Sequence, residues 1–310
     1  YHWPFSADVY AADENERVGL VRTDLVTAGK SNCGTFESKL VQSGNLCWDI
    51  DGEFKTALEK LMLSVSGTLG MRDSGGPLYD VEFGTPENQE RNPVDLGALN
   101  PAFAGMSFNG KIMAKGQISN DSGTMKSGAG ISVTEATLEA PGRKFKLEGL
   151  ELFIGLQDLV QLKSQPKQRL RFGRMTAGNI RLDSGEIEFQ IESPKKYFIE
   201  RSAFSWCSGH VYSQAMRIEP DEDLDFILYC DRLNLAAVLR QFQASEGSGE
   251  GTVSGRIPVV VRNRRIRIND GFLYSSPGQG GNIRIGHSQV LDSTGIQEQA
   301  IDMAIAVAAL

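Results

Sequence analysis

The feature that most constrains the fold is a strict two-residue alternation across residues 106–119. Apolar or small side chains occupy every second position, at Met106, Phe108, Gly110, Ile112, Ala114, Gly116 and Ile118. Successive side chains of a β-strand point to opposite faces, so this pattern predicts one strand with an apolar face. At about 3.3 Å per residue the strand would be roughly 40 Å long. A compact sandwich rarely needs strands of that length, which favours an extended sheet.

Shorter alternating segments separated by turn residues surround this strand. Residues 61–69 alternate Leu, Val and Gly with Ser and Thr, and a turn is expected at 74–77. Further turns are expected at 120–123 and at Pro141–Gly142. The repeated rhythm of strand and turn predicts a meander of antiparallel strands.

The second half of the chain continues this rhythm. The apolar parity shifts after Gly149, which predicts a β-bulge, and residues 156–162 are expected to form a loop or short helix. A hairpin is expected over 180–191, with its turn at Asp183-Ser184-Gly185. Three more strands are predicted over 198–206, 211–218 and 224–230.

The predicted fold class is mainly β: a long, curved antiparallel meander sheet that forms a hydrophobic groove. Its apolar face must be covered by other parts of the protein or by a ligand. The small residues on this face indicate either a hollow wall or the twisting of the strands. The expected lining residues are Met106, Phe108, Ile112, Ala114, Ile118, Ile131, Val133, Phe145, Leu147, Ile180, Leu182, Ile187, Phe189, Ile191, Leu224, Phe226 and Leu228.

One helix is predicted from Leu235 to about Gln243. Leu235, Val238 and Leu239 belong to one apolar stripe, and Asn234 stands where an N-cap residue would. This helix could plug the groove, gate it or cap the edge of the sheet. In the strand that follows, Pro258 lacks a backbone N–H, which predicts a position at a sheet edge or a bulge.

The segment from 235 to 285 resembles the C-terminal region of YdbH-like proteins. These are AsmA-related intermembrane phospholipid transport proteins of Gram-negative bacteria, also labelled a dicarboxylate transport domain. The resemblance rests on the runs LAAVL, GTVSGRIPV and IRINDGFLYSSPGQGGNIRI, and its signature residues are Gly251, Gly255, Pro258, Asp270, Gly271, Pro277, Gly278 and Gly281. It implies a periplasmic part of an inner-membrane-anchored protein, with a greasy groove for phospholipid acyl chains.

The predicted organisation has three parts. Residues 1–92 form an N-terminal β-meander, 93–290 form the YdbH-like β-groove region, and 291–310 form a C-terminal helix. Both ends of the chain look cut from a longer polypeptide, so a membrane anchor is expected outside it, and an envelope protein is a possible partner at the C-terminal end. A structural or interaction β-solenoid of the cell envelope with a self-filled core is the alternative.

The charge of the chain opposes a nucleic-acid partner. The formal net charge is −7, whereas binding to phosphates needs clustered Lys and Arg. The one basic cluster, Arg262, Arg264, Arg265 and Arg267, is interpreted as the solvated side of a hairpin or as a contact to anionic lipid headgroups. No run of 18 or more apolar residues is present.

Catalytic and metal sites are not expected, and neither is a cofactor. The string DSGGPL around Ser74 matches the nucleophile segment of trypsin-like proteases, but the only upstream histidine is His2. The four cysteines, Cys33, Cys47, Cys207 and Cys230, lack the paired spacing of a zinc site. They are interpreted as buried free thiols, with a Cys33–Cys47 disulfide as the alternative.

Overall fold

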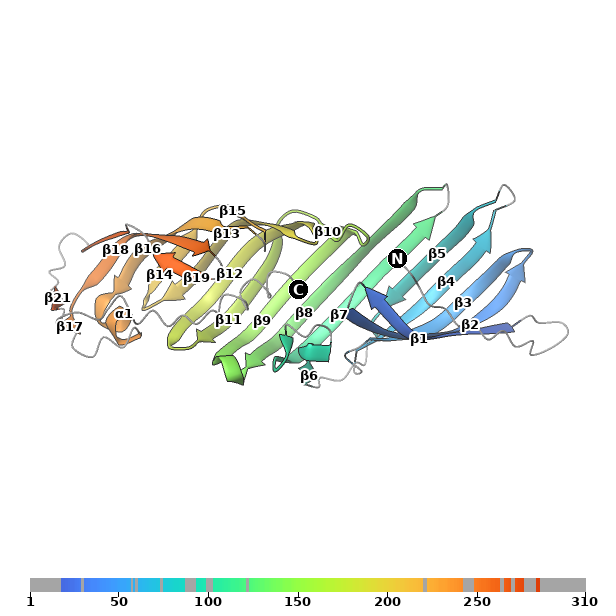
Figure 1. Ribbon diagram of the computed structural model, residues 1–310, viewed down its shortest axis with the longest axis horizontal. Coiled ribbons are helices and arrows are strands. Elements are labelled where there is room, and N and C mark those ends of the chain that lie inside the picture. Colours follow the sequence, from blue (N-terminus) through green and yellow to red (C-terminus); the bar gives the residue numbers. More distant parts are fainter. Residues whose placement is uncertain are drawn as a thin grey trace. The chain divides into compact units, whose positions relative to one another are not determined.

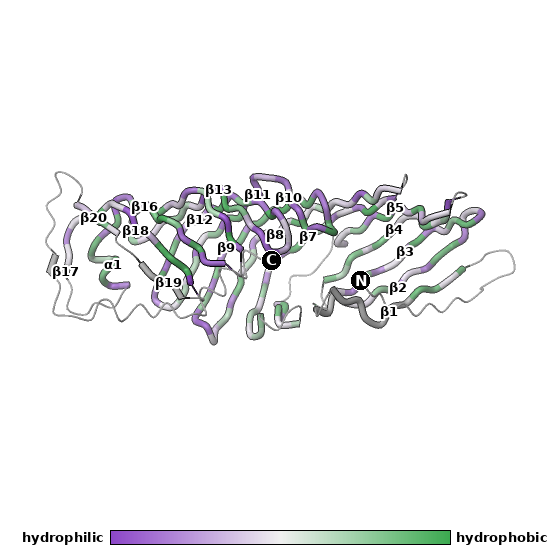
Figure 2. The backbone as a smooth tube through the Cα atoms, turned by 45° about the horizontal axis from the view of Figure 1, so that its top comes forward, coloured by the Kyte–Doolittle hydropathy of each residue, from purple (hydrophilic) through white to green (hydrophobic). Residues whose placement is uncertain are grey.

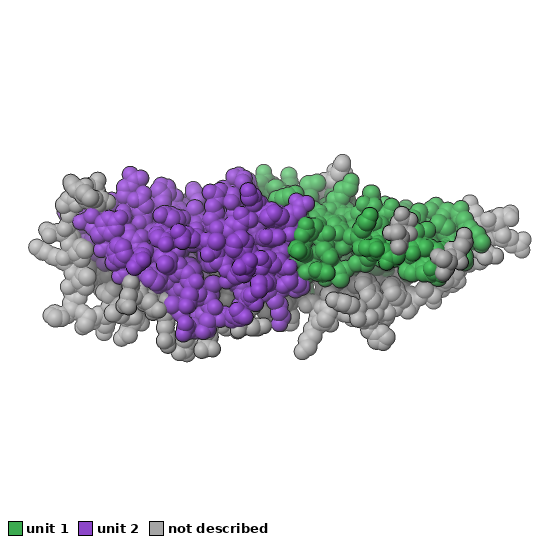
Figure 3. Space-filling view, turned by 90° about the horizontal axis from the view of Figure 1, so that it is seen from above, with its two compact units in different colours: residues 1–136, 153–163 green, residues 137–152, 164–310 purple. Residues whose placement is uncertain are grey.

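The computed structural model describes the chain in segments. They are residues 18–28, 31–56, 58, 61–72, 75–86, 93–98, 103–120, 123–219, 222–241, 248–262, 265–268, 271–275 and 283–284. The chain divides into two compact units, coloured separately in Figure 3. Unit 1 comprises residues 1–136 and 153–163, and unit 2 comprises 137–152 and 164–310. Each unit is described in turn.

Unit 1 is built from antiparallel hairpins in chain order. Its strands are β1 (Val18–Ala28), β2 (Ser31–Gly44), β3 (Cys47–Thr56), β4 (Met62–Met71), β5 (Pro77–Gly84), β6 (Val94–Asp95), β7 (Ser107–Asn120), and the first part of β8 (Met125–Ala140) with the last part of β9 (Phe145–Asp158). Each of β1 to β4 pairs with the next strand, and β7 pairs with both β5 and β6. The turn η1 (Leu96–Ala98) precedes β7.

Unit 2 contains the remaining parts of β8 and β9 and the strands that follow them. These are β10 (Lys163–Ser164, whose first residue belongs to unit 1), β11 (Gln168–Ala177), β12 (Ile180–Ser193), β13 (Lys196–Trp206), β14 (Gly209–Ser213), β15 (Met216–Ile218), β16 (Leu224–Asn234), β18 (Thr252–Arg262), β19 (Arg265–Ile268) and β20 (Phe272–Ser275). Two short strands, β17 (Ser248–Gly249) and β21 (Ile283–Arg284), pair with each other.

The predicted fold class is confirmed as mainly β. In the described residues, the strand pairs with a defined register are antiparallel in both units. Strands that follow one another in the chain lie side by side within each unit (Figure 1). Hydrophobic and hydrophilic residues alternate along these strands (Figure 2), which confirms the meander predicted from the two-residue period.

The hairpin predicted over 180–191 is wrong. Residues 180–193 form one continuous strand, β12, and Ser184 adopts a left-handed φ of 49° inside it. The register with β13 shifts between Asp183 and Glu186, so the Asp-Ser-Gly sequence makes a β-bulge instead of a turn. β12 pairs with β13 on one side and with β11 on the other, and the outer face of β11, rich in Arg, hid this strand in the sequence.

Three smaller expectations have clear outcomes. Gly149 has a φ of 65°, and the buried parity changes from Leu147 to Leu150 across it, which confirms the bulge. Residues 156–158 continue β9, so the loop predicted over 156–162 begins only at 159. Of the two positions expected for Pro258, the sheet edge is wrong, because β18 has partners on both sides. The alternative, a bulge, fits the one-residue register shift opposite Pro258.

Pro258 lies between the two strands that pair with one side of β18. β18 pairs with β20 through Arg256 and with β19 from Val259 onward, so Pro258 lies between the two pairings. A Cβ added to Gly271 would lie 3.3 Å from Cδ of Pro258, which is bonded to the proline nitrogen. Pro258 therefore lies where the pairing register shifts by one residue, which is a position where a residue without a backbone N–H is tolerated.

The predicted helix is confirmed as α1 (Leu235–Gln241). Oδ1 of Asn234 accepts a hydrogen bond of 2.9 Å from the backbone N–H of Ala237, which is the expected N-cap interaction. The predicted end at 243 and the predicted C-terminal helix lie outside the described residues. Among the described helices, none combines the length and the hydropathy needed to cross a bilayer.

Candidate functional site

The candidate site in unit 1 is an apolar face built from aligned cross-strand rows. One row runs through Leu40, Ile50, Gly67, Val81 and Ile118, each directly opposite the next on the neighbouring strand. The adjacent row runs through Ser38, Gly52, Val65, Phe83 and Gly116. Register and parity together place these side chains on one side of the sheet, which we call the apolar face of unit 1.

Most of this apolar face is accessible. Of the apolar-face residues on β3, β4 and β5, Ile50 is the one described residue that is buried, at 8% exposure. Val65, Val81 and Phe83 are half-buried. A packed second layer would bury such residues nearly completely. The face therefore offers apolar surface that can bind another apolar group.

The opposite face of unit 1 is polar. Lys39, Asp51, Ser66, Glu82 and Gln117 form a cross-strand row there. All five are exposed. The two faces of the same strands thus differ in chemistry, so an apolar ligand would be accepted on one side only.

A cavity of about 510 Å³ lies at β2 and β3. Its lining combines the charged residues Glu37, Lys39, Asp51, Glu53 and Lys55 with Leu20, Thr35, Phe36, Ser38 and Gly52. The lining is therefore mixed, and two of its residues, Ser38 and Gly52, also belong to the apolar face.

The lining residues predicted in unit 1 have different environments. Ile112, Ala114 and Ile118 of β7 and Ile131 of β8 are half-buried. The predicted residues at the start of β7 and in the middle of β8 are buried: Met106 at 1%, Phe108 at 7% and Val133 at 8% exposure. Val94 pairs with Phe108, and the N–H of Leu96 donates to the carbonyl of Met106. This end of β7 is thus packed against the β6–η1 segment.

Half of the lining residues predicted in unit 2 are buried. Exposure is 6% for Phe145, 2% for Leu147, and 9% each for Leu182, Phe189 and Ile191. The other predicted residues of this unit are half-buried: Ile180, Ile187, Leu224, Phe226 and Leu228. Cross-strand pairing joins Phe189 to Ile199 and Phe226 to Val259, so the predicted residues do meet other apolar side chains.

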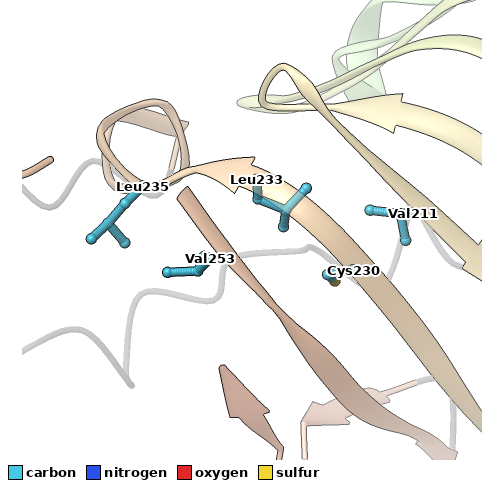
Figure 4. Close-up of a cluster of buried hydrophobic side chains, with 5 residues drawn as sticks. All are labelled: Val211, Cys230, Leu233, Leu235 and Val253. Carbon is cyan, nitrogen blue, oxygen red and sulfur yellow. The ribbon is translucent and has the colours of Figure 1, made fainter. Parts of the chain in front are cut away.

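A cluster of buried hydrophobic side chains lies between α1 and the last strands of unit 2. Val211, Cys230, Leu233, Leu235 and Val253 form it (Figure 4). Val238 and Leu239 of the helix pack against it, together with Phe204 and Trp206 of β13, Leu228 of β16 and Ile257 of β18. The predicted apolar stripe of the helix therefore faces the sheet.

A side-chain amide secures the far end of α1. Oε1 of Gln241 accepts hydrogen bonds from Nε1 of Trp206 at 2.9 Å and from the backbone N–H of Arg181 at 3.1 Å. These bonds join the helix to β13 and β12 without any charged contact. The helix is thus held at both ends, by the Asn234 cap and by Gln241.

The described cysteines are free thiols, so the alternative Cys33–Cys47 disulfide is not formed. Cys207 and Cys230 are buried, and burial raises the pKa of each thiol to about 11. At neutral pH both thiols stay protonated and are poor nucleophiles.

Other potentially reactive groups show no catalytic arrangement in the segments that the structure covers. Ser74 and the terminal histidines lie outside them, while Gly75 and Gly76 form the turn that joins β4 to β5. His210 is exposed on β14 opposite Asp231. No group of three metal-ligating side chains occurs among the described residues.

Comparison with known families agrees with this geometry. A family model described as "YdbH-like: Intermembrane phospholipid transport protein YdbH" matches residues 85–307. The chain belongs to the YdbH-like family. The family is one of lipid transport proteins, not of enzymes. Neither the curated proteins nor the solved structures include a significant match.

The structure gives physical reasons for part of the YdbH-like signature. Gly255 has a φ of 156°, and a Cβ there would lie 2.0 Å from the carbonyl oxygen of Phe272, so no other residue fits. The carbonyl of Gly251 accepts the N–H of Leu235 at 3.1 Å. Asp270, Pro277, Gly278 and Gly281 lie outside the described residues.

Sequence reasoning left the accessible residues of unit 1 out of the predicted site. Leu40, Val65, Val81 and Phe83 are half-buried on the apolar face, yet the predicted lining begins only at Met106. Their two-residue alternation was the available signal. Local alternation identifies an apolar side but does not tell which part of that side is left uncovered.

Proposed function

We propose that this chain is a non-enzymatic, lipid-conducting segment. Its apolar face accepts the acyl chains of phospholipids that move between the inner and outer membranes. The observation that carries the proposal is the accessible apolar face of unit 1, with Val65, Val81 and Phe83 half-buried on aligned strands. Membership of the YdbH-like family supports phospholipid as the ligand.

The energetics explain why such a surface suits an acyl chain. Each methylene removed from water contributes about 0.8 kcal/mol, so a sixteen-carbon chain would cost on the order of 12 kcal/mol to carry exposed. An apolar strip shared by many strands reduces this cost without specific polar contacts. Transport then requires only that the apolar face solvates the acyl chain, and no chemical step is needed.

The location that follows is the periplasm. A segment that passes phospholipids between two membranes has to lie between them, and the remainder of the protein would supply the membrane anchor.

Unit 2 offers a specific argument for the alternative function. Half of its predicted lining residues are buried, and α1 packs over a buried cluster at one end. A structural β-module with a self-filled core would have this appearance. We therefore assign the lipid-binding role to the apolar face of unit 1.

The experiment compares two aspartate substitutions on neighbouring positions of β4. Val65→Asp introduces a charge on the apolar face, and Ser66→Asp introduces the same charge on the polar face. Lipid extracted from each purified variant is quantified by mass spectrometry. We expect Val65→Asp to lose most of its co-purifying phospholipid and Ser66→Asp to keep the wild-type amount.

Circular dichroism checks that both variants retain the sheet. Equal phospholipid content in two folded variants would refute the assignment of the apolar face. Absence of phospholipid from the wild type would favour the self-filled module.

A further inference from the structure

The outer face of unit 2 changes character between β13 and β14. On β11, β12 and β13 it carries an ion-pair ladder in which Glu186 contacts Arg169, Arg171 and Arg201, and Glu188 contacts Arg169 and Arg201. Such a ladder is typical of a solvated sheet face. From β14 onward the same side carries aromatic residues instead.

These aromatic residues form one continuous cross-strand row. Tyr212 on β14 lies opposite Tyr229 on β16, Tyr229 lies opposite Arg256 on β18, and Arg256 lies opposite Phe272 on β20. Tyr274 is the next residue of the same parity on β20. Adjacent strands are about 4.8 Å apart, so four strands give a row roughly 14 Å long. We call these five residues the aromatic row.

Close ring contacts connect the members of the row. The rings of Tyr212 and Tyr229 stack at 5.2 Å, and those of Phe272 and Tyr274 stack at 6.1 Å. The guanidinium of Arg256 lies 5.1 Å from the centre of the Phe272 ring. The row is therefore an ordered surface and not a set of unrelated exposed side chains.

The row is also exposed to solvent. Tyr212 is 46%, Phe272 51% and Tyr274 53% exposed. Inward neighbours such as Val211 and Cys230 are buried at 1% and 5%. Exposed apolar groups in one contiguous area mark an interaction surface.

The charge of residues 251–269, which include Arg256, indicates an anionic partner. Residues 251–269 contain five arginines and no acidic residue, a formal charge of +5 in a chain whose net charge is −7. Arg262 pairs with Asp223 at 3.3 Å and with Asp225 at 3.7 Å. No ion pair joins Arg256 to a carboxylate in the described part of the chain, so its charge can bind an external anion.

We propose that the aromatic row is a docking surface for the headgroup region of a bilayer that contains anionic phospholipid. Tyrosine and phenylalanine place their rings at the boundary between headgroups and acyl chains, and arginine binds the phosphates. This deepens the proposed function, on which it rests, because a conduit has to meet a membrane to exchange lipid.

The test is vesicle flotation with the full 310-residue chain. Vesicles containing phosphatidylglycerol are compared with vesicles of phosphatidylcholine alone, at low and at high salt. We expect binding to the anionic vesicles that weakens with salt, because screening shortens the range of the arginine charges. Co-purifying phospholipid is measured on the same preparations.

Two variants test separately the arginine and the aromatic rings of the aromatic row. Arg256→Gln should lower partitioning onto anionic vesicles about fivefold, as expected for one basic residue near the surface. The double variant Phe272→Ser with Tyr274→Ser should lower it by at least about tenfold, because two rings no longer insert. Phe153→Ser and Arg171→Gln remove an exposed ring and an exposed cation elsewhere, and they should bind as the wild type does.

The outcomes separate this inference from the proposed function. If the wild type carries phospholipid but does not float with anionic vesicles, the docking surface is wrong and the conduit stands. If it floats but carries no phospholipid, the conduit is wrong and the docking surface stands. Equal binding to both kinds of vesicle, or equal losses in the control variants, would overturn the assignment to the aromatic row.

Discussion

Gly67 provides the sharpest test of the geometry of the apolar face. It lies in the middle of β4 with a φ of 151°, a conformation that side-chain-bearing residues rarely adopt. A Cβ at this position would lie 2.1 Å from the carbonyl oxygen of Asp80 and 2.8 Å from Cα of Val81. Both atoms belong to the backbone of β5, so the strands have to separate to accept alanine.

The expected cost of Gly67→Ala has two parts. Backbone strain at an unfavourable φ is worth about 1–3 kcal/mol. Weakening one or two ladder hydrogen bonds adds about 1 kcal/mol each. We therefore expect the free energy of unfolding to fall by roughly 2–5 kcal/mol.

Urea denaturation followed by circular dichroism measures this change. Gly84→Ala is the matched control, because it lies on the adjacent strand, has no positive φ, and its nearest neighbour would be 3.4 Å away at the carbonyl of Ala114. We expect the control to change stability by less than about 1 kcal/mol. A Gly67→Ala variant as stable as the control would refute the close approach of β4 and β5.

Three further predictions concern unit 2. Gln241→Ala removes the acceptor of Trp206 and should cost about 1–2 kcal/mol, seen as faster amide hydrogen exchange in α1. Cys230 should resist alkylation in the native protein at pH 8 and react in urea, because burial raises its pKa to about 11. A hydrogen bond from Arg201 lowers the pKa of Glu188 below its ordinary 4.5, so the carboxylate stabilises the fold above that pH. The stability difference between the wild type and Glu188→Gln should therefore disappear as the pH falls below about 4.5, which acid titration of the unfolding midpoint measures.

Local sequence signals predicted much of the secondary structure. The alternation in residues 106–119 identified β7, and the parity change at Gly149 identified a bulge. Asn234, as an N-cap residue, identified the start of α1. These features depend on residues within a few positions of one another, so a single segment carries the information.

The wrong predictions arose where one short sequence pattern is compatible with two different structures. Asp183-Ser184-Gly185 suits a turn, but the pairing of β12 with β11 and β13 makes it a bulge. Pro258 suits an edge strand or a bulge, and the pairing of β18 with both β19 and β20 shows that it lies inside the sheet, at a register shift. In both cases the partner strand, distant in sequence, decides the outcome.

The sequence by itself determined which side chains share a face, where most strands end, and that the chain belongs among proteins with an extended apolar sheet. The tertiary structure alone decided which of those apolar side chains remain accessible. Val65 and Phe189 follow the same alternation, yet one is half-buried and the other is 9% exposed. Alternation follows from the backbone of one strand, whereas exposure depends on everything that packs over it.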